Sequence, residues 1–258
     1  MRILLLLAWT WTWLTISGSG RAEATTLEGG VRHMDLMPSV EESFRKGNVL
    51  DASVFENLNS GNGWVRVPAW MAGTWLVQEE TAVYRKDFAS GRSTKSPHRF
   101  KARHKFIYGM QKDRLGGIWH YIGVPYKSET RLASVNEIHL VKEKRFDPYT
   151  ENRVRFRSVV NVIRVKRTNH GRDQKIKESY VQESITSYEP YSANSDDIKL
   201  QASTKSFNQD GKPMIQADNE ARVKKLAQFS PVNNYRDRDM RYLFRLFLTE
   251  TGRDDLLP

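Results

Sequence analysis

Aromatic and histidine side chains recur on two neighbouring segments in the middle of the chain, and their types are those that hold small molecules. His104 lies on the apolar side of an alternating run with Phe106 and Tyr108, and Trp119 and Tyr121 follow in the next run. Aromatic rings bury large apolar areas, while a few polar atoms orient a ligand. We therefore predict that these five residues line a site for an apolar small molecule.

The histidines leave a second chemistry open. A neutral imidazole is a common metal ligand and can bind haem iron, and His104, His120 and His139 lie in different runs of the sequence. No two histidines have the i, i+2 or i, i+4 spacing that metal sites often show. We expect hydrogen-bonded or surface histidines, with a metal or haem ligand as the alternative, and we predict no metal and no cofactor.

Several other chemistries are excluded by what the sequence lacks. The chain has no Cys, which excludes a disulfide framework, a thiolate zinc site, an iron–sulfur cluster and a cysteine nucleophile. It also has no Gly-x-Ser-x-Gly elbow for a serine nucleophile and no Gly-x-x-x-x-Gly-Lys loop for phosphate. The sequence therefore predicts a protein that is not an enzyme. The alternative is an enzyme that acts on lipid or pigment, which no motif in the sequence supports.

The first 24 residues have the pattern of a cleaved secretory signal. Arg2 precedes an apolar stretch from Ile3 to Ile16, and Ala22-Glu23-Ala24 supplies the small residues that a signal peptidase requires. The apolar stretch is shorter than the roughly 20 residues that span a bilayer, which disfavours an uncleaved anchor. We predict cleavage after Ala24, a periplasmic or secreted location and no transmembrane segment in the mature protein.

Residues 63–232 have the texture of successive β-strands. From Arg99 to Lys112 apolar and basic side chains alternate, as in a strand with one buried face. The turn from Asn208 to Lys212 contains Asp-Gly, a strong hairpin signal. The sequence predicts an all-β, eight-stranded antiparallel up-and-down barrel, with strands at residues 74–88, 99–112, 118–124, 136–145, 153–166, 174–188, 199–207 and 213–229.

Two further segments flank this predicted barrel. Residues 25–62 carry little pattern and are predicted to form an N-terminal extension. Residues 233–258 contain the one convincing helix, predicted over 235–252, with Asn234 as its N-cap. An apolar stripe at helical spacing must be buried, and we expect it to pack on the outside of the barrel; it consists of Met240, Leu243, Phe244, Phe247 and Leu248.

A tripeptide at the start of the first long strand carries a resemblance to a known family. Gly73-Thr74-Trp75, followed by seven further strand candidates and a terminal helix, resembles the calycin superfamily, the lipocalins and lipocalin-like bacterial β-barrels. The resemblance implies that Trp75 closes the barrel floor and that Arg222 packs over its ring. Trp70 and Gly73 belong to the same segment, in which the aromatic side chains are predicted to be structural, with a ligand platform as the alternative.

The charge of the chain bears on its partners. The sequence has 41 Lys and Arg against 30 Asp and Glu, a net charge of +11. Alternation places Arg153, Arg155, Arg157 and Arg167 on one face of a strand, which could meet an anionic envelope component or be an ordinary solvated surface. The predicted secretion disfavours nucleic acid. We predict a secreted or periplasmic lipocalin-like binding protein for an apolar small molecule, or alternatively a non-enzymatic accessory component of a cell-envelope assembly with a protein partner.

Overall fold

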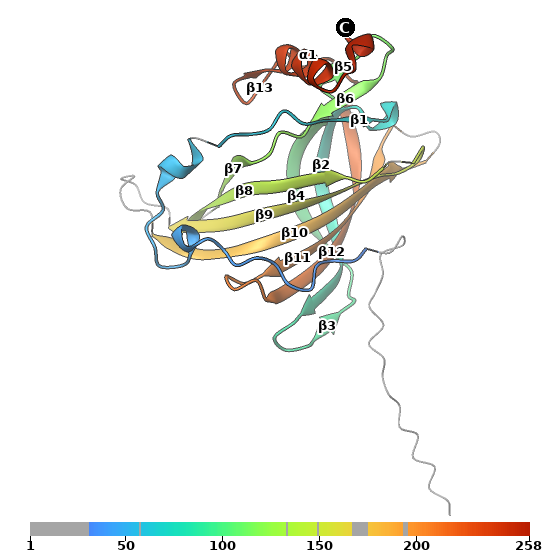
Figure 1. Ribbon diagram of the computed structural model, residues 1–258. Coiled ribbons are helices and arrows are strands. Elements are labelled where there is room, and N and C mark those ends of the chain that lie inside the picture. Colours follow the sequence, from blue (N-terminus) through green and yellow to red (C-terminus); the bar gives the residue numbers. More distant parts are fainter. Residues whose placement is uncertain (1–30, 57, 133, 149, 167–174, 193–195) are drawn as a thin grey trace, which may run out of the picture. The chain divides into compact units, whose positions relative to one another are not determined.

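The computed structural model describes residues 31–258 except 57, 133, 149, 167–174 and 193–195, and it is mostly antiparallel β-structure (Figure 1). The predicted signal peptide lies outside the described residues. None of the described helices is long and apolar enough to cross a membrane.

Nine strands form one large sheet. Its order is β7-β8-β9-β10-β11-β12-β2, and the far edge of β2 pairs with both β3 and β4. All pairs in this sheet are antiparallel. The strands are β2 (Gly73–Asp87), β3 (Ser93–Thr94), β4 (His98–Tyr108), β7 (Tyr126–Arg131), β8 (Val135–Phe146), β9 (Val154–Lys166), β10 (Ile176–Pro190), β11 (Ile198–Phe207) and β12 (Pro213–Ala227).

A small sheet and several short elements complete the fold. The small sheet has the order β1-β6-β5, and β13 pairs with β14 in a two-residue hairpin. These elements are β1 (Trp64–Val67), β5 (Gln111–Lys112), β6 (Ile118–Tyr121), β13 (Asn234–Tyr235), β14 (Arg238–Asp239), the α-helix α1 (Met240–Glu250) and the 3-10 helices η1 (Glu42–Phe44), η2 (Ala52–Phe55), η3 (Ala69–Met71) and η4 (Asp254–Leu256).

The antiparallel all-β architecture with a C-terminal α-helix is confirmed, but the prediction of eight barrel strands is wrong. Residues 118–121, which the sequence places in the barrel, form β6 and pair with β1 in the small sheet. Residues 126–131 form the additional strand β7. In the described part of the chain, no ladder of hydrogen bonds joins β7 to β4. The large sheet is therefore open between these two edges, although its first long strand β2 lies beside its last, β12.

The two faces of the large sheet have separate cores. The side chains of β9 alternate between them: Val154 and Phe156 point to the face that carries Trp75, which we call the inner face, and Ile163 and Val165 point to the outer face. The inner-face core consists of Met71, Trp75, Val77, Tyr108, Val154, Phe156, Tyr188, Ile198, Leu200, Ala221 and Val223.

Residues 31–56 cover part of the outer face. Val40, Phe44 and Leu50 are buried against side chains of the large sheet such as Ile163 and Phe207. A backbone hydrogen bond also joins this segment to the turn between β11 and β12, from the Val40 amide to the Gln209 carbonyl (2.9 Å). Burial of these three apolar side chains against the large sheet stabilises the packing of the segment on the outer face.

The C-terminal helix packs on the small sheet and not on the outside of the large one. Met240, Phe244 and Leu248 are fully buried against a core that includes Trp64 and Trp119. The two tryptophans give the small sheet an apolar surface on which the apolar side chains of α1 pack. The predicted stripe is correct, and its packing surface is corrected to the small sheet.

The helix begins five residues later than the sequence predicts. Arg236 and Asp237 have positive φ angles of 52° and 59° and form the turn of the hairpin between β13 and β14. The N-cap is Asp239, whose carboxylate accepts hydrogen bonds from the Arg241 and Tyr242 amides. The hairpin takes the residues that the sequence pattern assigned to the first turn of helix, and Asn234 is not the cap.

Candidate ligand site

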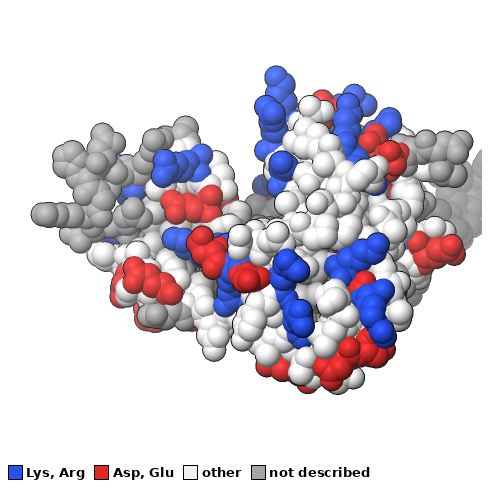
Figure 2. Space-filling view, turned by 90° about the horizontal axis from the view of Figure 1, so that it is seen from above, with Lys and Arg blue, Asp and Glu red and all other residues white. Residues whose placement is uncertain are grey.

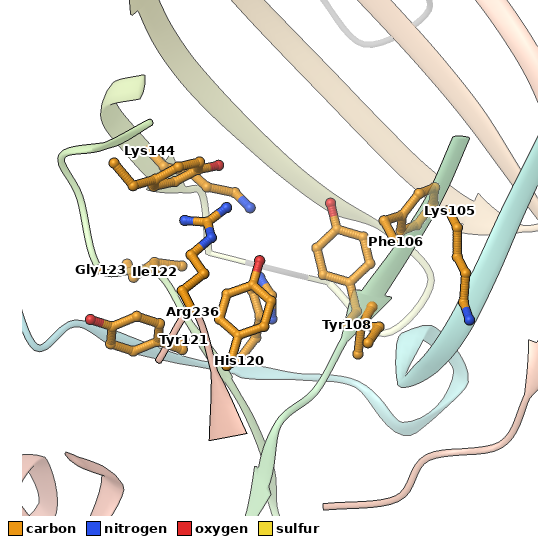
Figure 3. A pocket seen from close by; sticks show the side chains of 12 residues that line it. Lys105, Phe106, Tyr108, His120, Tyr121, Ile122, Gly123, Lys144 and Arg236 are labelled. Atoms are coloured by element: carbon orange, nitrogen blue, oxygen red, sulfur yellow. The ribbon is translucent and has the colours of Figure 1, made fainter. Parts of the chain in front are cut away.

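A cavity of about 400 Å³ lies beside the open edge of the large sheet, and we call it the edge cavity (Figure 3). Its wall combines the end of β4, strand β6 with the loop after it, β7, β8 and the turn between β13 and β14. The lining residues are Lys105, Phe106, Ile107, Tyr108, His120, Tyr121, Ile122, Gly123, Tyr126, Lys144, Tyr235 and Arg236. Segments distant in the sequence thus share one hollow.

Aromatic rings form the deep part of the edge cavity. The Tyr108 ring lies 5.3 Å from Phe106, 4.9 Å from His120 and 5.4 Å from Tyr188 between ring centroids, in edge-to-face geometry with each. The Tyr108 and Tyr188 hydroxyls are 3.4 Å apart. Burial raises the pKa of both phenols, so both are neutral hydroxyls at physiological pH. This wall suits a flat apolar group.

His120 is buried, and one of its ring nitrogens lacks a hydrogen bond. The residue is 4% exposed, and its Nδ1 atom has no hydrogen-bond partner among the described residues. Burial, followed by the nearby charges of Lys144 and Arg236, holds the pKa of His120 well below its usual range. The ring is therefore a neutral imidazole that can donate or accept one further hydrogen bond.

Two cations reach the cavity and rest on aromatic rings. The Lys144 Nζ atom lies 4.8 Å from the centre of the Phe156 ring and 5.6 Å from that of Tyr108. The Arg236 guanidinium lies 3.5 Å from the centre of the Tyr126 ring. Burial, followed by the charge of Arg236, lowers the pKa of Lys144 to about 8. Cation–π contact of this kind stabilises the charges only partly, because it is weaker than pairing with a carboxylate.

The structure brings together three of the five predicted ligand residues. Phe106, Tyr108 and Tyr121 line the edge cavity. His104 shares the inner face with Phe106, two residues away, but it is exposed and outside the cavity lining. Trp119 is buried under α1, where its Nε1–H donates to the Asp113 carboxylate (2.8 Å). Trp119 is therefore part of the core between the small sheet and α1, because its strand β6 belongs to the small sheet.

The sequence reasoning missed three lining residues with polar function. His120 is predicted to be a hydrogen-bonded or surface histidine, with a metal or haem ligand as the alternative, and neither Lys144 nor Arg236 is singled out. The spacing of Lys144 on an alternating strand resembles that of an ordinary surface lysine. One signal could have been used: Tyr235-Arg236-Asp237, which the sequence pattern assigns to the first turn of the helix, also has polar residues that can form a turn.

The residues of the Gly-x-Trp segment that are predicted to be structural pack against, or donate hydrogen bonds to, neighbouring backbone groups. Trp75 is 0% exposed, and its Nε1–H donates to the Met71 carbonyl (2.8 Å). Gly73 has φ +138°, and a Cβ atom there would lie 2.6 Å from the Ala227 carbonyl oxygen, so only glycine fits. Trp70 lies half-buried at the edge of the inner-face core and donates to the Glu151 carbonyl.

Arg222 does not pack over Trp75. It is exposed, lies between the inward residues Ala221 and Val223, and forms an ion pair with Asp197 (2.6 Å). The cation over the Trp75 ring is Lys225, at 5.0 Å. The predicted contact is therefore wrong, because alternation along β12 directs Arg222 to the outer face.

The row of arginines on β9 is paired with acidic side chains. Arg153 pairs with Glu189 and Arg155 with Asp147, and Arg157 pairs with Glu183; Arg167 lies outside the described residues. In the view from above, basic and acidic side chains are interspersed (Figure 2). The described arginines of this row thus have carboxylate partners, which weakens the case for a basic docking strip.

A charged cluster lies on the inner face at the other end of β8 and gives a pH prediction. Glu137 accepts from His139 (2.8 Å) and Arg164 (2.6 Å), and these bonds, the histidine first, lower its pKa to about 2 against the effect of burial. A lowered folded-state pKa contributes stability that is complete above the unfolded pKa near 4.5 and is lost as the pH falls toward about 2.

We therefore expect Glu137→Gln to lower the free energy of unfolding by about 1 to 2 kcal/mol at pH 6, after allowance for solvent screening. The difference in the free energy of unfolding between Glu137→Gln and wild type should shrink between about pH 5 and pH 2. Urea unfolding at a series of pH values across this range measures it. Glu178→Gln is the matched control, since Glu178 pairs with the same Arg164 but is half exposed. A constant difference across this pH range would contradict the assignment.

The described residues contain no group of three His, Asp or Glu side chains placed to hold a metal ion. Comparisons with protein-family models, with curated proteins and with solved structures give no match for this chain.

Proposed function

We propose that this protein binds a small molecule with an apolar or aromatic body in the edge cavity, without catalysing a reaction. The observation that carries the proposal is the wall of rings from β4, β6, β7 and the hairpin turn around about 400 Å³. Ligand cavities typically measure about 300 to 1,000 Å³ and are lined mainly by apolar and aromatic side chains with a few polar groups.

The surrounding architecture supports a lipocalin-like binding protein. The first long strand pairs with the last through β2 and β12, and Gly73-Thr74-Trp75 opens the first of them. A barrel that is open at one seam would give a ligand a route to the inner face. We further propose that cleavage after Ala24 releases the protein to the periplasm or the exterior, as the N-terminal pattern indicates.

Binding can be tested with phenylnaphthylamine, a neutral probe that fluoresces in apolar surroundings. We expect the wild-type protein to bind it and Phe106→Trp to weaken binding by about tenfold or more, because the larger indole fills space that the probe needs. The measurement is a fluorescence titration, with thermal unfolding to show that the variant is folded.

Phe100→Trp is the matched control for this experiment. Phe100 lies on the same strand as Phe106 but lines a different hollow, between β2, β3, β4 and β12. Its substitution should leave the titration unchanged. A probe that does not bind, or one whose binding is weakened by Phe100→Trp and not by Phe106→Trp, would reject the edge cavity as the binding site.

One observation favours the alternative function in a cell-envelope assembly. Strand β7 is an edge of the large sheet, and five of its six residues are exposed. An exposed edge presents unpaired backbone groups to which a strand of a partner protein can add. An accessory protein would use this edge, whereas a small-molecule carrier would not need it.

A further inference from the structure

The charges of the edge cavity are all of one sign. Lys105, Lys144 and Arg236 line it, and no Asp or Glu is among its described lining residues. None of the ion pairs in the described part of the chain includes Lys144 or Arg236. The arginines of β9 and Arg222 do have carboxylate partners. Lys144 and Arg236 thus have no carboxylate partner in the described part of the cavity.

The two inner cations are held in place although they repel each other. Arg236 lies flat against Tyr126 on a hairpin turn with positive φ, and Lys144 rests among three aromatic rings. In Figure 3 Arg236 rises from the hairpin turn into the middle of the cavity on the side of Lys144, whereas Lys105 extends away from them. Because stacking uses the face of the guanidinium, the N–H groups along its edges, apart from the one that donates to the Tyr235 hydroxyl, can donate to an oxyanion.

His120 adds an independent indication of a missing partner. Its Nδ1 atom is buried and lacks a hydrogen bond within the described residues, and its ring lines the same cavity. Buried polar atoms in folded proteins are nearly always hydrogen-bonded, because an unmade bond costs free energy. A ligand with a polar group near the two cations would supply this bond.

We infer that the ligand is an organic monoanion, whose carboxylate or sulfonate lies between Lys144 and Arg236 while its aromatic or aliphatic body lies against Phe106 and Tyr108. This inference rests on the proposed function and names the chemical class of its ligand. An inorganic anion would leave the ring-lined part of the cavity empty. A neutral apolar molecule would leave Lys144, which lies among three aromatic rings, and Arg236 without an anionic partner.

The test compares two probes that differ by one charged group. Anilinonaphthalene sulfonate has the aromatic skeleton of phenylnaphthylamine together with a sulfonate. Wild-type protein should bind the sulfonate about tenfold more tightly or better, and Lys144→Met and Arg236→Gln should each remove about this tenfold advantage. Both variants should bind the neutral probe within about twofold of wild type, since they keep the rings.

Lys101→Gln is the matched control because Lys101 is an exposed cation of β4 outside the cavity lining. It should leave both titrations unchanged. Phe106→Trp should weaken binding of both probes, which places the sulfonate in the edge cavity. Circular dichroism and thermal unfolding show whether each variant is folded, and either of the two cation variants is sufficient for the comparison.

The outcomes separate this inference from the proposed function. Equal affinity for the two probes, or a sulfonate advantage that survives both Lys144→Met and Arg236→Gln, overturns the anion inference while the cavity remains a binding site. A sulfonate advantage that Lys101→Gln also removes assigns it to surface charge and likewise overturns the inference. If neither probe binds, the proposed function fails and the inference fails with it.

Discussion

Replacement of Trp75 by Ala is expected to lower the free energy of unfolding by about 3 to 5 kcal/mol, because it removes a large side chain from a close-packed core. Trp75 is 0% exposed and lies at the centre of the inner-face core with Val77 and Val223. The substitution also leaves the Met71 carbonyl without the indole donor. Urea unfolding followed by circular dichroism measures the change.

Trp70→Ala is the control for this experiment. Trp70 lies in the same segment but is half-buried at the rim of the core, and its indole also donates to a backbone carbonyl. The expected loss is smaller, about 1 to 2 kcal/mol, because less apolar surface returns to water. Equal losses for the two variants, or an unchanged midpoint for Trp75→Ala, would show that Trp75 is not the centre of the core.

Replacement of Glu183 by Ala is expected to cost about 3 to 5 kcal/mol of stability and to loosen the segment that covers the outer face. The carboxylate is 0% exposed and accepts hydrogen bonds from the His33 imidazole and the Met34 amide, each 2.9 Å long. It also pairs with Arg157. Removing it leaves the partly buried Arg157 cation and the Met34 amide without this partner, which is why a single carboxylate has so large an effect.

Two measurements check this result. Urea unfolding gives the change in global stability, and hydrogen exchange followed by mass spectrometry reports on residues 33–50, whose protection should fall more than that of β2. His33→Ala is the control, since it removes one partner but keeps the carboxylate with Arg157. We expect it to cost about 1 kcal/mol. Unchanged protection of the segment in Glu183→Ala would contradict its role as an anchor.

Glu183, His33 and Ser203 are linked in the order acid–histidine–serine that is also found in serine hydrolases, but here the three residues have a structural role. His33 Nδ1 contacts Glu183, and His33 Nε2 lies 2.8 Å from the Ser203 hydroxyl. Ser203 is 1% exposed, however, and its hydroxyl donates to the Asp218 carboxylate (2.6 Å). A nucleophilic serine must give its proton to the histidine and be open to substrate. The network therefore fastens the covering segment to the sheet.

Local sequence patterns were sufficient to locate most of the long strands. The alternation over residues 99–112 covers β4 except for His98, and that over 153–166 contains β9, because successive side chains of a strand point to opposite faces. The Asp-Gly turn joins β11 to β12, and Gly211 has the positive φ that such a turn requires. The apolar stripe of α1 is equally local, since helical spacing alone defines which side chains share a face.

Long-range pairing lay beyond these patterns. The run from Ile118 has the alternation of a strand, but alternation does not state which sheet the strand joins. Trp119 and Tyr121 form one core with Trp64 and Phe244, and this core draws β6 into the small sheet. The opening between β4 and β7 follows from that choice, because the segment expected to bridge them has a different partner.

Local spacing predicts the antiparallel β-architecture, the glycine at the start of β2 and the aromatic residues Phe106 and Tyr108 of the candidate site. That Lys144 and Arg236 belong to the same site is visible only in the folded chain. Each resembles an ordinary surface cation when its own neighbours in the chain are considered. They meet because β8 and the hairpin after β12 both end beside β4, and such a meeting depends on strand register and packing between distant segments, which no local spacing encodes.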